Sequence, residues 1–248
     1  MELIENNVEL LSIHIPKTGG SSFQKTLQSL YPDSAFQRLD FTVRDLRGSS
    51  RMIATNRTSQ SLLDQIFEQR KLPDEVRAVH GHFHYEDFVK FFQLDASATV
   101  VTWLRDPVRR VVSNYHYLIA SFEREIQHTP LSSQLFNRLV KSLPEFARNP
   151  RDTGLYEDYL RGRALNDYAF IGIVEQYEAE LVRMAQTLQL PELPPFKVNR
   201  ARQKAPELNE QQTLLLTALN ETNLNIYRQA VAIREHFVRR GSDSDKTL

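Results

Sequence analysis

The sequence contains no cysteine, which excludes disulfides, thiolate metal sites and a cysteine nucleophile, and which suits a reducing compartment. No apolar run approaches the length needed to span a membrane, and the N-terminal segment 1–16 carries acidic residues where a secretory signal carries basic ones. Lys and Arg total 31, as do Asp and Glu, so no global charge gathers nucleic acid. We therefore expect a cytoplasmic chain whose anion sites are local.

Apolar patterning predicts one domain over 1–240 and a disordered polar tail over 241–248. Apolar and β-branched runs predict four strands, over 8–15, 76–83, 99–104 and 169–174. Helical spacing predicts helices over 23–30, 61–71, 85–92, 132–148, 154–162, 208–220 and 224–239, with others beginning at 107 and after 174. The segment 31–55 has a weak pattern and no element is predicted there. Alternating strands and helices indicate an α/β fold with a central parallel sheet flanked by helices.

The stretch PKTGGSS connects the first predicted strand to the first predicted helix. Gly19 and Gly20 allow backbone N–H groups to approach an oxyanion, and a helix starting near Ser21 adds its positive end. Lys17 supplies a full charge, and the hydroxyls of Ser21 and Ser22 can donate. Because Lys17 precedes the glycines, the spacing departs from the G-x-x-x-x-G-K-[ST] pattern of nucleotide hydrolases. The loop predicts an anion site, although an ordinary left-handed turn explains K-T-G-G alone equally well.

A second basic motif, RDPVRRVVSNY, follows the strand predicted over 99–104. Arg105 leaves the carboxyl end of a central strand, where open α/β sheets bind their ligands, and Ser113 lies on the next helix. Asp106 and Pro107 are suited to be the N-cap and first residue of that helix. Arg105 and Ser113 could hold a second phosphate through charge-assisted hydrogen bonds. An Arg–Asp pair beside a helix cap is the purely structural alternative.

The two motifs in this order resemble those of sulfotransferases that use 3′-phosphoadenosine 5′-phosphosulfate (PAPS) and release 3′-phosphoadenosine 5′-phosphate (PAP). They are most similar to the carbohydrate-modifying group that includes the heparan sulfate 2-O-sulfotransferases. The resemblance implies a P-loop-like three-layer fold. It places these residues on the 5′-phosphosulfate loop: Lys17, Thr18, Gly19, Gly20, Ser21 and Ser22. It places these on the 3′-phosphate motif: Arg105, Asp106, Pro107, Arg110, Ser113 and Tyr115. Animal members carry a membrane anchor and lie in the Golgi, whereas this sequence shows no such anchor.

Transfer of a sulfuryl group to a hydroxyl requires in-line positioning, charge stabilisation on the leaving oxygen and a general base. Lys17 is placed to stabilise the leaving oxygen. In the family that the motifs resemble, the base is either a carboxylate on the helix after the loop or a histidine elsewhere. That helix, SSFQKTLQSLY, carries no Asp or Glu.

The H-G-H at 80–82 offers the histidine, because residues two apart on a strand project to the same side and both imidazoles could face one cleft. The matching H-G-H of the 2-O-sulfotransferases includes their proposed base, and on that resemblance we favour His82 as the catalytic base, with His80 second. Considered alone, such a pair is more often a pair of surface or core histidines, or half a metal site, than a catalytic base. We expect no metal.

The segment KVNRARQK is a Pro-bounded basic loop, and members of the resembled family place a basic segment over the cofactor phosphates. Within it we select Lys204 as a cofactor-binding residue, while a solvated basic loop is the alternative.

The leading hypothesis is a PAPS-dependent sulfotransferase that acts on a hydroxyl of a carbohydrate or glycoconjugate. A nucleotide-dependent kinase would instead use Asp106 to hold magnesium. The position of Lys17 and the arginine directly before Asp106 argue against it. A catalytically inactive module that binds a nucleotide or a sulfated glycan would keep Lys17 and Arg105 and need no base.

Overall fold

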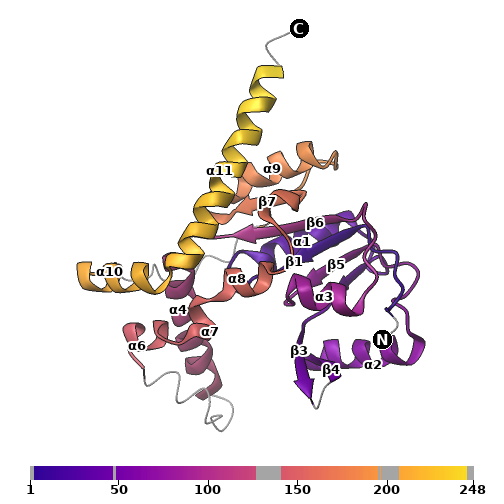
Figure 1. The fold of residues 1–248 in the computed structure, drawn as a ribbon, viewed down its shortest axis with the longest axis horizontal. Helices are drawn as coiled ribbons and strands as arrows, with labels where there is room; N and C mark the ends of the chain where they lie inside the picture. The colour runs from indigo at the N-terminus through magenta and orange to yellow at the C-terminus, as the bar shows by residue number, and fades with distance from the viewer. Residues whose placement is uncertain (1–2, 47–48, 127–140, 195, 197–206, 245–248) are drawn as a thin grey trace. The chain divides into compact units, whose positions relative to one another are not determined.

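The computed structural model describes residues 3–46, 49–126, 141–194, 196 and 207–244 (Figure 1). They form two compact units. The first comprises residues 1–104 and 158–199, and the second comprises 105–157 and 200–248. This division does not test whether residues 1–240 form a single domain, which stays a prediction.

A five-stranded parallel sheet organises the first unit, with the strand order β2-β5-β1-β6-β7 (Figure 1). The strands are β1 (Leu10–Ile13), β2 (Phe36–Arg38), β5 (Ala78–Gly81), β6 (Thr99–Leu104) and β7 (Phe170–Ile173). Every residue of β1, β5 and β7 is buried, as expected for a parallel sheet that is covered on both faces. The predicted α/β fold with a central parallel sheet flanked by helices is confirmed.

The helices of the first unit are α1 (Gly20–Leu30), α2 (Arg57–Gln69), α3 (Tyr85–Phe91) and α9 (Tyr177–Thr187), with short 3₁₀ turns at Leu165–Asp167 and Val174–Gln176. Helices α1 and α9 share one core cluster with the sheet. The indole of Trp103 lies at its centre, with its ring centroid 5.2 Å from that of Phe23 and 4.7 Å from that of Tyr177. This packing holds the first turns of α1 against β6 and α9.

The second unit is helical. It contains α4 (Pro107–Ile126), α6 (Leu143–Ala147), α7 (Pro150–Thr153), α10 (Glu210–Leu219) and α11 (Glu221–Ser244), while α8 (Leu155–Leu160) spans the boundary between the units. Its core cluster includes Val111, Phe146 and Leu216. The carboxylate Oδ1 of Asp106 accepts the backbone N–H of Arg109 at 2.8 Å, which confirms the predicted N-cap of α4.

Three strands occur in the segment 31–55, where the sequence predicted none. Besides β2, these are β3 (Phe41–Leu46) and β4 (Ser49–Ala54), which pair as an antiparallel hairpin. The two exposed arginines Arg44 and Arg51 lie opposite each other in this hairpin, so its apolar pattern is interrupted. Helix α2 begins at Arg57, earlier than the predicted 61, because the side chain of Asn56 caps it by accepting the N–H of Ser59.

Two other predictions fall partly outside the described residues. Of the helix expected over 132–148, residues 132–140 lie outside them, and α6 accounts for the remainder. Helix α11 continues to Ser244, so the first four residues of the expected disordered tail are helical, while 245–248 lie outside the described residues.

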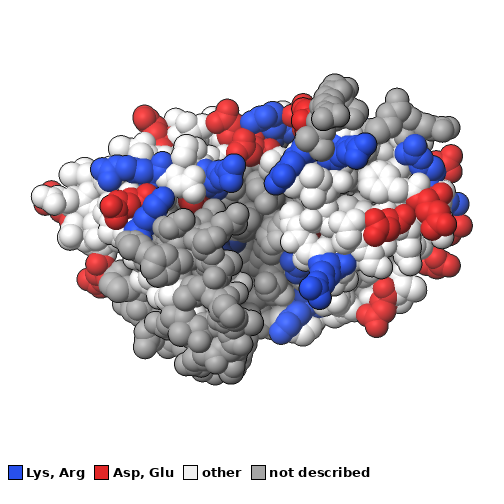
Figure 2. All heavy atoms as spheres, turned by 90° about the horizontal axis from the view of Figure 1, so that it is seen from below, with Lys and Arg blue, Asp and Glu red and all other residues white. Residues whose placement is uncertain are grey.

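The described helices include none that is both long and apolar enough to cross a membrane. On the face drawn in Figure 2, the described basic and acidic side chains are interspersed, in keeping with the equal totals of the two kinds. Attraction for an anion therefore comes from individual residues and backbone groups, which directs attention to the loop before α1.

Candidate active site

The loop between β1 and α1 has an unusual backbone. Lys17 and Gly19 have φ angles of 70° and 80°, in the left-handed region that residues other than glycine rarely occupy. Gly19 is the N-cap of α1 and provides no side-chain cap. Helix α1 is 11 residues long and its positive end begins here. A helix N-terminus that follows a lysine is a candidate anion site, because its backbone N–H groups and dipole favour negative charge.

The three hydroxyls of the loop differ in orientation. Thr18 is fully buried, and its Oγ1 donates to the carbonyl of Ile15 at 2.7 Å. Ser22 is also buried, whereas Ser21 is exposed. Thr18, which the sequence assigned to cofactor binding, therefore has its hydroxyl engaged in closing the loop. Of the three hydroxyls, only that of Ser21 belongs to an exposed residue.

Three histidines cluster where the carboxyl ends of β1 and β5 meet. The ring of His14 stacks on that of His82 with centroids 4.0 Å apart, and its centroid lies 5.0 Å from that of His80. His80 is only 1% exposed, and its Nδ1 lies 2.8 Å from Oγ of Ser12. Its ring packs edge-on against Phe23 of α1. The predicted shared cleft is therefore not what this structure shows, because α1 covers His80 while His82 beyond the strand end is partly exposed.

Hydrogen bonding fixes the proton position on His82. Its Nδ1 lies 2.6 Å from the carbonyl oxygen of His14, which can only accept, so Nδ1 carries the proton. In the neutral ring the lone pair is then on Nε2, and no described residue hydrogen-bonds to that atom. A ring held in this tautomer can accept a proton at Nε2.

Burial keeps the histidines neutral. Burial lowers the pKa of His80 to about 3 and also lowers the pKa of His14 well below 6.5, and in each case the charges on neighbouring residues act in the same direction overall. The pKa of His82 is lowered as well, chiefly by burial, although the carboxylate of Asp40 and the carbonyl of His14 oppose that effect. At neutral pH, His82 is therefore in its basic form.

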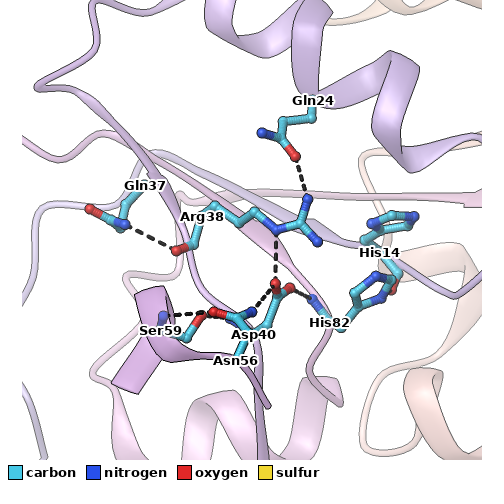
Figure 3. A network of polar contacts seen from close by, with 8 residues as sticks. All are labelled: His14, Gln24, Gln37, Arg38, Asp40, Asn56, Ser59 and His82. Carbon is cyan, nitrogen blue, oxygen red and sulfur yellow. Dashed lines mark hydrogen bonds and ion pairs between the residues drawn. The ribbon is translucent and has the colours of Figure 1, made fainter. Parts of the chain in front are cut away.

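A polar network centred on the buried carboxylate of Asp40 adjoins His82 and was not predicted from the sequence (Figure 3). Asp40 accepts the backbone N–H of His82 at Oδ1, and accepts Arg38 Nε and Asn56 Nδ2 at Oδ2, each at 2.8 Å. Arg38 also donates to Gln24 of α1. The alternation Arg-Leu-Asp in an extended segment was the available signal, since it places both charged side chains on one side.

The motif that follows β6 lies in the second unit, while the loop and the histidines lie in the first. The backbone of Arg105 is held by Tyr156, because its N–H donates to the Tyr156 hydroxyl oxygen at 3.0 Å and that hydroxyl donates to its carbonyl. Ser113 lies partly exposed on α4. Lys204 lies outside the described residues. Among the residues that are described, no group of three His, Asp or Glu side chains is suited to a metal ion.

A substitution at Gly20 tests the packing of α1 against the ring of His14. A Cβ atom at this position would lie 1.9 Å from Nε2 of His14. We expect Gly20→Ala to displace the His14 ring and to lower the free energy of unfolding by about 1–3 kcal/mol, the usual cost of overpacking. Denaturant unfolding measures the effect, with Lys25→Ala on the exposed side of α1 as control. Equal stability of the two variants would contradict this packing.

Comparison with known proteins gives one family. The family model described as "Sulfotransferase family" matches residues 3–236. No curated protein matches the sequence. Among solved structures, the fold matches mouse sulfotransferase SULT7A1 complexed with PAP at a TM-score of 0.38 and 12% identity, covering 90% of this chain and 66% of that one. It also matches a sulfotransferase from Alicyclobacillus acidocaldarius at a TM-score of 0.43 and 13% identity, covering 92% and 98%. The chain therefore spans slightly less than two thirds of the mouse protein.

Proposed function

Because this chain belongs to the sulfotransferase family, we propose that it transfers the sulfuryl group of PAPS to a hydroxyl of a carbohydrate or glycoconjugate. The observation that carries this proposal is the state of His82, a neutral histidine whose Nδ1 proton is held by a backbone carbonyl and whose Nε2 is hydrogen-bonded by none of the described residues. Its ring stacks on His14, three residues before Lys17 in the anion loop. The similarity of H-G-H to the 2-O-sulfotransferases supports a carbohydrate acceptor.

The residues of the loop fit the 5′ end of the donor. The first turn of α1 offers backbone N–H groups and a positive helix end, and Lys17 adds a full positive charge. We assign the 3′-phosphate to Arg105, with the hydroxyl of Ser113 as a further donor, because a guanidinium group forms paired charge-assisted hydrogen bonds with phosphate oxygens. When bound, PAPS supplies an activated sulfuryl group.

His82 and Lys17 then act on opposite sides of the transfer. His82 Nε2 takes the proton of the acceptor hydroxyl while the acceptor oxygen forms its bond to sulfur. The bond between sulfur and the bridging oxygen breaks, and its electron pair stays on the 5′-phosphate of PAP. The ammonium group of Lys17 stabilises the charge that develops on that oxygen. The imidazolium of His82 returns its proton to solvent after product release.

Calorimetric binding of PAP tests the donor site without knowledge of the acceptor. We expect PAP to bind without a metal and more tightly than ATP with magnesium, and Lys17→Ala and Arg105→Ala each to weaken binding about tenfold or more. Lys25→Ala and Arg109→Ala are matched controls, because both side chains are exposed and lie on α1 and α4, the helices that follow Lys17 and Arg105. A preference for magnesium ATP would overturn the proposal and restore the kinase alternative. PAP binding without turnover on any acceptor would favour the inactive module.

A further inference from the structure

Asp40 is a buried carboxylate that no part of the proposed reaction uses. It is 2% exposed, and both of its oxygens are occupied by hydrogen bonds from Arg38, Asn56 and the backbone of His82 (Figure 3). Burial alone would raise its pKa, but the hydrogen bonds from Arg38 and from the His82 backbone, together with the neighbouring positive charge, outweigh burial and lower the pKa. Asp40 is therefore ionised while it lies against the base.

The segment containing Asp40 is tied closely to the H-G-H. The N–H of Leu39 donates to the carbonyl of His80 and that of Phe41 donates to the carbonyl of His82, both at 3.0 Å. Gly81 permits this approach, because a Cβ there would lie 1.8 Å from the Leu39 carbonyl oxygen. The negative charge of Asp40 is consequently held at a fixed position beside His82.

We propose that Asp40 is the positioning residue of His82: it holds the His82 backbone and stabilises the imidazolium that forms when Nε2 accepts the proton of the acceptor hydroxyl. This rests on the proposed function of His82 as base. The geometry gives the His14 carbonyl and Asp40 different roles. The carbonyl of His14 orients the ring through Nδ1, and Asp40 supplies the compensating charge from the other side of the residue. Removal of the charge leaves a base that is harder to protonate.

Arg38 opposes the effect of Asp40 on the pKa of His82. Its guanidinium is bonded to Asp40 and Gln24, and its positive charge lowers the pKa of His82 while that of Asp40 raises it. The neighbouring rings of His14 and His80 are neutral at physiological pH, and the charge of Lys17 acts on His14. Asp40 and Arg38 are thus the charged groups that set the basicity of His82.

Opposite charges predict opposite shifts, and NMR titration of ¹⁵N-labelled histidine measures them in the full chain without donor or acceptor. The His82 signal is assigned by its loss in His82→Asn. We expect Asp40→Asn to shift the pKa of His82 downward and Arg38→Gln to shift it upward, with the Nδ1–H tautomer retained in both. With an acceptor in hand, Asp40→Asn should also lower kcat, by about 10–100-fold if it matters as much as the hydrogen-bond partners of metal-binding histidines do.

A purely structural tie would not produce shifts of opposite sign. Unchanged or upward movement of the His82 pKa in Asp40→Asn overturns the proposal, as does a downward shift in Arg38→Gln. If Asp40→Asn fails to fold, Arg38→Gln alone decides, since it leaves the bonds of Asp40 to Asn56 and to His82 in place. PAP binding is measured on the same samples. Its failure in the unaltered chain counts against the sulfotransferase proposal, while the titration still decides the role of Asp40.

Discussion

His82→Ala is expected to lower kcat about 10²–10⁴-fold while PAP binds with unchanged affinity, because the substitution removes the proton acceptor and leaves the anion loop intact. The neutral ring presents its lone pair at Nε2, since the His14 carbonyl holds the proton on Nδ1. Transfer of radiolabelled sulfate from PAPS to an acceptor glycan measures the rate, and calorimetry measures the affinity.

His84→Ala is the matched control for this experiment. His84 lies two residues further along the chain, and its Nδ1 is 3.1 Å from a carboxylate oxygen of Asp87. We expect this variant to retain its turnover. A His82→Ala enzyme with normal kcat would remove His82 from the mechanism, and a loss of the same size in His84→Ala would attribute the effect to the segment as a whole.

The pH dependence of kcat/KM tests the direction in which the folded protein shifts the pKa of His82. The folded protein lowers this pKa below 6.5, so the basic form persists at pH 6.5 and is lost only as the pH falls through the lowered value. We expect the acid limb of kcat/KM to have its midpoint below pH 6.5. An acid limb with its midpoint above pH 6.5 would contradict the environment described for this ring.

Four strands of the central sheet were predictable because they are buried on both faces, whereas the short edge strand β2, with only its first residue buried, was not. Strand β6 is buried at all but its first residue, and such strands appear in the sequence as nearly continuous apolar runs. The hairpin of β3 and β4 was not predictable, since its exposed residues interrupt the pattern and a cross-strand pair such as Arg44 with Arg51 is invisible before the register is known. Local patterns thus identify elements with two covered faces better than elements with one.

The candidate site also contains features that the sequence could predict and features that it could not. The loop between β1 and α1 is contiguous in sequence, so its lysine and glycines could be proposed as an anion site directly. The hydrogen bond from the His82 backbone to Asp40 joins residues 42 positions apart, and no local sequence pattern predicts it. The difference between the two histidines of H-G-H was also hidden, because it depends on α1 covering His80 and leaving His82 partly exposed. Tertiary packing, more than spacing, distinguishes a core histidine from a candidate base.

Lys17→Ala is expected to lower kcat about 10²–10³-fold, because it removes the cation that stabilises the leaving oxygen in the transition state. Lys17 has a left-handed backbone with a φ of 70°, so a substitution by glycine can remove the side chain and the backbone strain together. Lys17→Gly should lose the same activity yet gain about 1 kcal/mol in the free energy of unfolding relative to Lys17→Ala, since glycine adopts this conformation without penalty. Lys25→Ala controls for the loss of a lysine from this region. Full activity in Lys17→Gly would show that the backbone of the loop, and not the ammonium group, supports the transfer.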